Sequence, residues 1–258
     1  MSAAPVILEA TGVRLAFGGV RAVDGVDLRV REREIAALIG PNGAGKTSLF
    51  NALTGFFYPD AGTVRFRGED VTRMPNWQRI SRGIGRTFQS PSIFPEMSVA
   101  QNLTIGIQSS FRLSLSLRPP SAGRRRELEA RLVELLGFVK LERLRDRQVA
   151  ELSHGDQRLV EIAMSLSTSP SLIMLDEPTA GLAEADTSRI LSIVRDLHDR
   201  LGLTVLFVEH NMRFVAALAQ TVTMMDRGRV LLDGPPSVVL KDPRARDAYL
   251  GAEESVRA

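Results

Sequence analysis

The alternation of apolar and polar residues near the start of the chain predicts half-buried strands. Apolar side chains occupy alternate positions from Val6 to Leu8 and from Val26 to Val30, which is the period of a strand with one buried face. We expect Gly18-Gly19 and Gly25 to break these strands, because glycine favours turns. The pattern therefore predicts an antiparallel layer at the start of the fold.

Short, continuously apolar runs predict a parallel sheet in the rest of the chain. The run Ile35–Ile39 indicates a buried strand, and the residues Lys46–Leu53 that follow it indicate a helix. Two further runs, Leu172–Leu175 and Leu203–Phe207, are separated by the amphipathic stretch Glu184–Leu201. This order is typical of a strand, helix, strand crossover, so we expect an α/β core with a parallel sheet.

The middle of the chain predicts an inserted helical lobe. Leu128, Leu132 and Leu135 recur at helical spacing, and the segment from Gln108 to Gly123 is rich in Ser, Arg and Pro, which favours an exposed, mobile connection. We expect one domain over residues 5–251, with a core of residues 5–89 and 166–251, a helical lobe of about 90–165 and a tail of 252–258.

The strongest chemical signal is the segment Gly40-Pro41-Asn42-Gly43-Ala44-Gly45-Lys46-Thr47, which lies between the predicted buried strand and its helix. It fits the phosphate-loop pattern, in which glycines let backbone N–H groups converge on phosphate oxygens at a helix N-terminus. Lys46 is placed to bind the β- and γ-phosphates, and the Thr47 hydroxyl to ligate Mg²⁺. The plain alternative, a glycine turn that binds nothing, does not explain eight matched positions with the expected flanks.

Two adjacent carboxylates end the apolar run Leu172–Leu175, namely Asp176 and Glu177. Successive side chains of a strand point in opposite directions. Asp176 can therefore approach Mg²⁺, while Glu177 faces a separate volume in which an attacking water fits. Solvated acids at an ordinary strand end are the alternative.

A third segment, Leu152-Ser153-His154-Gly155-Asp156-Gln157, precedes an amphipathic helix. Its hydroxyl and backbone donors suit a phosphate, but a serine that only caps the helix explains the local sequence equally well. The residues alone leave both interpretations open.

Composition excludes several classes of protein. The 258 residues include no cysteine, which rules out disulfides, zinc fingers and thiol catalysis, and any metal must be held by oxygen ligands. The apolar runs are too short to cross a bilayer, and the stretch from Met1 to Val13 lacks the basic, apolar and small-residue pattern of a secretory signal, so we expect a cytosolic chain. Acids and bases are nearly balanced, with a formal charge of +3, so no nucleic-acid partner is expected.

In order and spacing, these motifs resemble those of the ATP-binding subunit of an ABC transporter, over nearly the whole chain. The phosphate loop is followed by Gln89, then Leu-Ser-His-Gly-Asp, then Leu-Asp-Glu-Pro, then His210. Four shorter segments resemble those of the branch that imports branched-chain amino acids. Urea and short-amide importers are very close relatives of that branch. These segments are Phe17-Gly18-Gly19-Val20, Leu53-Thr54-Gly55-Phe56, Arg86-Thr87-Phe88-Gln89 and Ala248-Tyr249-Leu250-Gly251.

The resemblance implies a role for each motif residue. Phe17 would stack on adenine, Gln89 would sense Mg²⁺ and the membrane partner, Glu177 would be the catalytic base, and His210 would contact the γ-phosphate and the attacking water. The residues expected to bind ATP are Phe17, Gly40, Asn42, Gly43, Ala44, Gly45, Lys46, Thr47, Ser48, Gln89, Ser153 and Gly155. The residues expected to hold Mg²⁺ are Thr47, Gln89 and Asp176.

The resemblance also implies partners and a place in the cell. They are integral membrane permease subunits, a second and non-identical ATPase subunit and, indirectly, an extracytoplasmic solute-binding protein, with the chain on the inner face of the cell membrane. Two other functions stay open at this point. One is a soluble ABC-type ATPase switch that acts on DNA, ribosomes or a regulatory partner, and the other is a binding module without turnover. The transported solute is not identified by these motifs.

Two departures from the family pattern affect the surface that should face a second subunit. The chain has His154-Gly155-Asp156 where the family usually has Gly-Gly-Gln, which places a negative charge near the partner's γ-phosphate unless Asp156 is paired or turned away. Ala183 occupies a position that usually carries Asp or Asn. We therefore expect turnover or coupling between the two sites to be altered.

Overall fold

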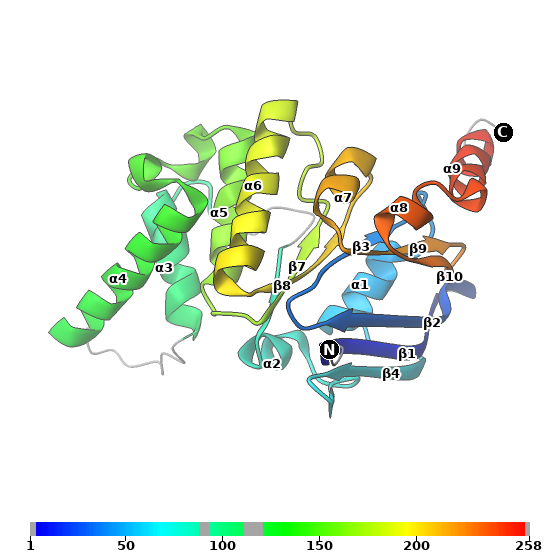
Figure 1. The fold of residues 1–258 in the computed structure, drawn as a ribbon. Helices are drawn as coiled ribbons and strands as arrows, with labels where there is room; N and C mark the ends of the chain where they lie inside the picture. The colour runs from blue at the N-terminus through cyan, green and yellow to red at the C-terminus, as the bar shows by residue number, and fades with distance from the viewer. Residues whose placement is uncertain (1–3, 88–92, 111–120, 256–258) are drawn as a thin grey trace.

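The computed structural model describes residues 4–87, 93–110 and 121–255, which form two β-sheets flanked by helices (Figure 1). The first sheet is antiparallel with strand order β2-β1-β4-β5, which confirms the antiparallel layer predicted from the alternating pattern. Its strands are β1 (Val6–Phe17), β2 (Val20–Arg31), β4 (Ala61–Phe66) and β5 (Glu69–Asp70).

One expectation for this sheet was wrong, because Gly25 does not break a strand. Val13 pairs with Val26, whereas the next residue, Arg14, pairs with Asp24. Gly25 is therefore one extra residue within β2, with a φ of +74°. Such a β-bulge bends and twists a strand without ending it, and glycine adopts the left-handed conformation without steric cost.

The second sheet has six strands in the order β10-β9-β3-β8-β7-β6, of which β10 runs antiparallel to β9 and the others are parallel. Its strands are β3 (Ile35–Ile39), β6 (Ile84–Arg86), β7 (Leu172–Asp176), β8 (Thr204–Val208), β9 (Thr221–Asp226) and β10 (Arg229–Gly234). The predicted parallel core is confirmed. Because β3, β8 and β7 are neighbours and parallel, the loops that follow them emerge at the same edge of the sheet.

Helices cover this sheet and form the lobe in the middle of the chain (Figure 1). They are α1 (Lys46–Thr54), α2 (Asn76–Ser81), α3 (Val99–Ser110), α4 (Ala122–Val139), α5 (His154–Leu166), α6 (Glu184–Leu201), α7 (Met212–Leu218), α8 (Pro236–Val239) and α9 (Pro243–Ser255), with two short 3₁₀ turns at Glu142–Leu144 and Val149–Glu151. Within the described ranges, no helix is both long and apolar enough to span a membrane.

The exposed connection predicted from Gln108 to Gly123 was too long. Helix α3 continues to Ser110, and α4 begins at Ala122. Ser121 explains the early start of α4, because its side chain accepts a hydrogen bond from the backbone N–H of Arg124 and so caps the helix. Residues 111–120 lie outside the described ranges, and the bounds of the lobe stay a prediction.

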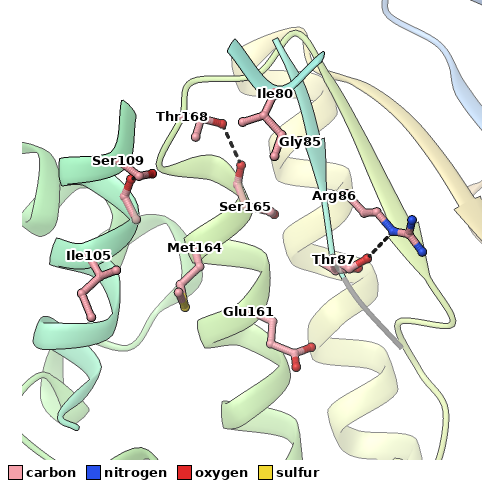
Figure 2. A pocket seen from close by; sticks show the side chains of 11 residues that line it. Ile80, Gly85, Arg86, Thr87, Ile105, Ser109, Glu161, Met164, Ser165 and Thr168 are labelled. Atoms are coloured by element: carbon pink, nitrogen blue, oxygen red, sulfur yellow. Dashed lines mark hydrogen bonds between the residues drawn. The ribbon is translucent and has the colours of Figure 1, made fainter. Parts of the chain in front are cut away.

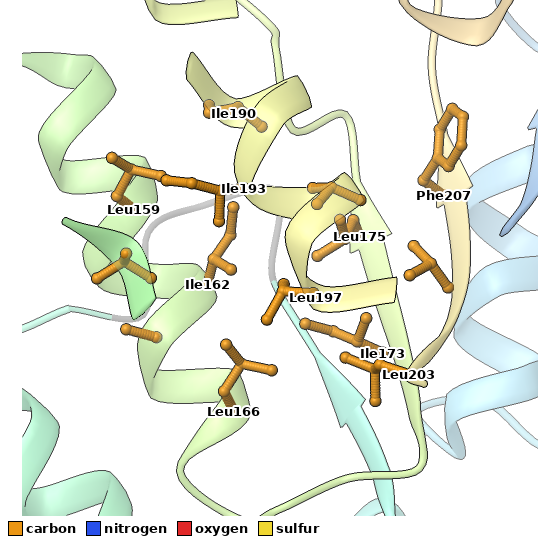
Figure 3. Close-up of a cluster of buried hydrophobic side chains, with 14 of the residues drawn as sticks. Leu159, Ile162, Leu166, Ile173, Leu175, Ile190, Ile193, Leu197, Leu203 and Phe207 are labelled. Atoms are coloured by element: carbon orange, nitrogen blue, oxygen red, sulfur yellow. The ribbon is translucent and has the colours of Figure 1, made fainter. Parts of the chain in front are cut away.

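The parallel strands are buried on both faces, and alternate residues enter two separate hydrophobic cores. In β7, Ile173 and Leu175 pack against the helical side, where leucine and isoleucine side chains of α5 and α6 cover them (Figure 3). Leu172 and Met174 belong to the other core, which α1 and the antiparallel sheet close. The same alternation places Asp176, the last residue of β7, on the α1 side. The core packing therefore aims this carboxylate at the phosphate loop.

Candidate functional site

The phosphate loop connects β3 to α1 and approaches other backbone segments too closely for side chains. A Cβ atom on Gly40 would lie 2.1 Å from the carbonyl oxygen of Met225, and one on Gly45 would lie 2.1 Å from that of Ala22. Both glycines also have positive φ, +146° and +95°. The loop geometry is therefore specific for glycine at these two positions.

Lys46 is buried at the first position of α1 and stabilises the loop from within. Its ammonium group donates to the carbonyl oxygens of Gly40 and Pro41 at 2.7 and 2.9 Å. Burial lowers the pKa of Lys46, and the negative charges of Glu177 and Asp176 partly oppose this shift. The cation thus already feels the charge of the two carboxylates at the end of β7, and an incoming phosphate offers it stronger partners than two carbonyls.

The other residues expected in the nucleotide site line this loop or the hairpin beside it. Asn42, Gly43 and Thr47 are exposed, Ser48 is half-buried and Ala44 is buried. Phe17 lies at the end of β1 with 44% of its surface exposed, and its ring meets that of Phe57 edge to face at 5.2 Å. An exposed aromatic ring of this kind suits stacking on a base. Gln89 lies outside the described residues.

Asp176 ends β7 as a buried carboxylate with one unpaired oxygen. Its Oδ2 lies 3.4 Å from a guanidinium nitrogen of Arg86, whereas its Oδ1 makes no hydrogen bond within the described part of the chain. Burial raises the pKa of Asp176, the charge of Arg86 opposes this shift, and Glu177 adds to it. An oxygen left free on a buried carboxylate fits a Mg²⁺ ligand, so these donors suit the expected metal.

Sequence reasoning did not assign a role to Arg86, the partner of Asp176. The guanidinium lies over the rings of Phe50 and Phe56, 4.9 and 4.8 Å from their centroids, and donates to the Thr54 hydroxyl at 2.6 Å. Burial lowers the pKa of Arg86, and Asp176 opposes this shift. Arg86 is therefore fixed by α1 and its flanking loop, and it holds the Asp176 carboxylate in place.

The structure brings Glu177 and His210 together, as their expected roles require. They follow neighbouring strands, β7 and β8, and the His210 Nε2 lies 2.8 Å from the Glu177 Oε1. Glu177 has a φ of +47°, which is uncommon for a residue other than glycine. Strain of this kind gathers at functional sites when the surrounding structure enforces it.

Arg158 of α5 enforces this backbone conformation, and sequence reasoning missed it. Its guanidinium donates to the carbonyl oxygens of Asp176, Glu177 and Pro178, and to the Glu161 carboxylate at 2.6 Å. The start of α5 is thereby tied to the end of β7. The position of Arg158, five residues after Ser153, gave no signal in the sequence.

Glu209 is a second residue that sequence reasoning missed. Its buried carboxylate accepts from the backbone N–H and the hydroxyl of Thr179 at 2.8 and 2.6 Å, and from the N–H groups of His210 and Asn211 at 2.9 and 3.1 Å. It joins the loop after β7 to the loop after β8. The available signal was an acid at the end of a buried apolar strand, directly before a histidine.

Ser153 caps α5, because its Oγ accepts from the Asp156 N–H at 3.1 Å. Gly155 lies against α6 so closely that a Cβ would meet the Asp186 carboxylate at 2.4 Å. Asp156 is paired with Arg189 of α6. The cap interpretation is thus correct for the isolated chain, and the expected contact of Ser153 with a partner's phosphate stays a prediction.

Two cavities adjoin these residues. One, of about 270 Å³, is lined by Glu177, His154, Arg158 and their neighbours. The other, of about 230 Å³ and mostly apolar, lies between α3, α5 and β6, with Arg86 and Thr87 on one wall (Figure 2). The Thr87 hydroxyl accepts from the Asp176 N–H at 3.2 Å, so the wall of this second cavity contacts the end of β7 directly.

The C-terminal helix also reaches the phosphate loop. The N–H of Gly40 donates to the Tyr249 hydroxyl at 3.0 Å. Burial raises the pKa of Tyr249 to about 12, so this phenol stays neutral at physiological pH. Tyr249 belongs to one of the segments that resemble amino-acid importers. Its contact with Gly40 gives this tyrosine a structural role at the phosphate loop.

Comparison with known proteins agrees with this geometry. Residues 23–180 match the family described as ABC transporter. The chain is 36% identical to the high-affinity branched-chain amino acid transport ATP-binding protein BraF of Pseudomonas aeruginosa and 37% identical to LivG of Escherichia coli, over 95% of this chain and 98% of each relative. It is also 36% identical to the lipopolysaccharide export system ATP-binding protein LptB of Acidithiobacillus ferridurans, over 88% of this chain and 89% of that protein.

Solved structures give the same result for the fold. A crystal structure of an ATP-binding cassette of an ABC transporter in its ADP conformation superposes with a TM-score of 0.84 and 34% identity, covering 95% of this chain and 99% of the other. The nucleotide-free form of an ATP-binding cassette from an ABC transporter superposes with a TM-score of 0.83 and 33% identity, covering 94% and 98%. The chain therefore belongs to the ABC transporter family.

Proposed function

We propose that this chain is the ATP-hydrolysing subunit of an importer for branched-chain amino acids. The observation that carries the hydrolytic role is the Glu177–His210 pair, 2.8 Å apart, beside a glycine-specific phosphate loop that holds Lys46. The proposed solute is supported by the similarity to BraF and LivG over 95% of this chain. Phosphate-binding donors, a base and its partner are thus collected at one edge of the sheet. A binding module without turnover does not require this pair.

The nucleotide is bound by the loop and the hairpin beside it. Lys46 and the N–H groups of residues 43–48 bind the phosphates, and Phe17 stacks on the adenine. Thr47, Asp176 and Gln89 would hold Mg²⁺, which neutralises charge on the phosphates when it is bound. The unpaired Oδ1 of Asp176 supports this assignment.

Hydrolysis uses the two residues at the strand ends. Glu177 accepts the proton of a water whose oxygen forms a bond to the γ-phosphorus, while the bond from that phosphorus to the bridging oxygen breaks and ADP leaves. His210 orients Glu177 and the attacking water. Arg158 and Glu209 keep the backbone of both loops in place, so the two side chains need little reorganisation.

Permease subunits are the proposed partners for the apolar cavity in Figure 2. A segment seated there would touch Thr87, which binds the Asp176 N–H, and Arg86, which binds the Asp176 carboxylate. Movement of the permease would thus change the position of Asp176, the proposed metal ligand. The proposed contact with permease subunits is consistent with a peripheral subunit on the cytoplasmic face of the membrane.

The working unit is proposed to pair this chain with a second, non-identical ATPase chain. Ser153 and Gly155 would then face the nucleotide bound by the partner. Asp156 and Ala183 both lie at the start of helices on the expected contact surface. A dimer of two identical chains would carry both departures from the family pattern in each of its two nucleotide sites. An extracytoplasmic solute-binding protein would deliver the solute to the permease.

The test is the complex recovered from native membranes through an affinity tag on this chain. We expect permease subunits and a second ATPase chain to be recovered with it, and uptake of labelled leucine, isoleucine and valine to fail when the chain carries Glu177→Gln. Recovery with ribosomes or DNA contradicts the transporter assignment. Loss of short-amide uptake with normal leucine uptake contradicts the solute, and a self-dimer with full turnover contradicts the mixed pair.

A further inference from the structure

In the isolated chain, the Ser153 hydroxyl already donates its proton to a hydrogen bond within the protein. The Ser153 Oγ lies 2.9 Å from the Asp156 Oδ2 and accepts from the Asp156 N–H at 3.1 Å. A carboxylate only accepts hydrogen bonds, so the hydroxyl donates its single proton to Asp156. Ser153 is exposed, but it has no second proton to give.

Asp156 is in turn held by α6. Its Oδ1 lies 2.5 Å from the Arg189 Nη1, and Arg189 also reaches the carbonyl oxygen of Lys140 at 3.5 Å. The two side chains are only 17% and 34% exposed. Both oxygens of Asp156 therefore have a partner, one at the N-cap of its own helix and one on the neighbouring helix.

We propose that Asp156 restrains Ser153 and that Arg189 moderates this restraint, so that this chain presents a weakened phosphate-binding serine to the nucleotide of the second ATPase subunit. This inference rests on the proposed function, in which Ser153 faces the partner's γ-phosphate. Phosphate oxygens at neutral pH accept hydrogen bonds, so Ser153 binds them only by withdrawing its proton from Asp156.

The two members of the pair act in opposite directions. Asp156 competes with the phosphate for the Ser153 proton and repels it by charge, so Asp156 slows turnover at the partner's nucleotide. Arg189 neutralises Asp156, so it relieves part of this repulsion. A pair that served only to stabilise the fold would give losses of the same sign for both residues.

The experiment measures MgATP turnover of the complex assembled with its permease and second ATPase subunit. We expect Asp156→Ala to raise kcat by about three- to tenfold, because it removes the competing charge-assisted acceptor, and Asp156→Asn to give a smaller rise. Arg189→Ala should lower kcat by a similar factor. Arg189→Lys keeps the positive charge and should therefore keep kcat near the parental value. In the double variant, Asp156→Ala should remove the deficit caused by Arg189→Ala.

Two controls separate this role from a loss of folding. Arg145 is 36% exposed and pairs with Glu129 through hydrogen bonds of 2.6 and 3.0 Å, so Arg145→Ala breaks a comparable ion pair and should leave kcat unchanged. ATP affinity of the isolated chain reports the Lys46 site and should not change in any Asp156 or Arg189 variant.

The outcomes also separate this inference from the proposed function. If Ser153→Ala lowers kcat but Asp156→Ala leaves it at or below the parental value, the restraint is refuted and the role of Ser153 stands. If Ser153→Ala leaves kcat unchanged, Ser153 does not bind the partner's γ-phosphate, and both the proposed role of Ser153 and the restraint by Asp156 are refuted. Opposite signs for Asp156→Ala and Arg189→Ala support the restraint.

Discussion

The carboxylate of Glu209 offers a sharp test of how the two catalytic loops are held together. It accepts four hydrogen bonds, two from Thr179 and one each from the N–H groups of His210 and Asn211. In Glu209→Gln, one carboxylate oxygen becomes an NH₂ group, which cannot accept a hydrogen bond. The variant keeps the size and shape of the side chain, so the change is confined to hydrogen bonding.

The structure sets the size of the effect. Whichever way the amide turns, two of the four donors lose their acceptor, and each loss at a charged acceptor costs about 1.5 kcal/mol. We therefore expect the free energy of unfolding to fall by about 3 kcal/mol, which lowers Tm by about 6–12 °C for a domain of this size. Because His210 lies in one of the released loops, kcat of the assembled complex should also fall by about tenfold or more, while ATP affinity is kept.

Urea unfolding and ATPase assays check these values. Thr179→Val is the matched control, since it removes one of the four hydrogen bonds and should cost about 1 kcal/mol. A Glu209→Gln variant with the parental unfolding midpoint would show that the four contacts do not stabilise the fold. A parental kcat in a destabilised variant would show that the contacts do not position His210.

Three further substitutions test individual assignments. Lys46→Ala should abolish productive MgATP binding in a nucleotide titration, because it removes the buried cation of the phosphate loop, and unchanged affinity in a folded variant contradicts the loop assignment. Glu177→Gln should keep ATP affinity and slow hydrolysis by about 10²- to 10⁴-fold, so a parental rate in the assembled complex rules out Glu177 as the base. Ala183 is the N-cap residue of α6 and offers no side-chain cap. Ala183→Ser should therefore raise the free energy of unfolding by about 1 kcal/mol in urea titrations, whereas no change would mean that other groups already satisfy the helix start.

Much of the fold and the centre of the candidate site could be predicted from local sequence. The phosphate loop is a strand, a glycine turn and a helix within consecutive residues, so its spacing alone indicates its geometry. The apolar run of β7 places Asp176 and Glu177 at a strand end for the same reason. The failure at Gly25 is also local, because a bulge and a strand break both favour glycine and differ only in whether the partner strand continues.

The residues that hold this site in position were decided by the tertiary structure. Arg86 contacts Asp176 across 90 positions, Arg158 contacts the Glu177 carbonyl across 19, Glu209 contacts Thr179 across 30, and Arg189 contacts Asp156 across 33. An arginine or a glutamate in a sequence does not specify which distant backbone or carboxylate it will meet. Pairing of β6 and β8 with β7 brings Arg86 and Glu209 to their partners, and packing of α5 and α6 on the sheet does the same for Arg158 and Arg189. Because buried polar groups must be paired, this tertiary arrangement selects the partners.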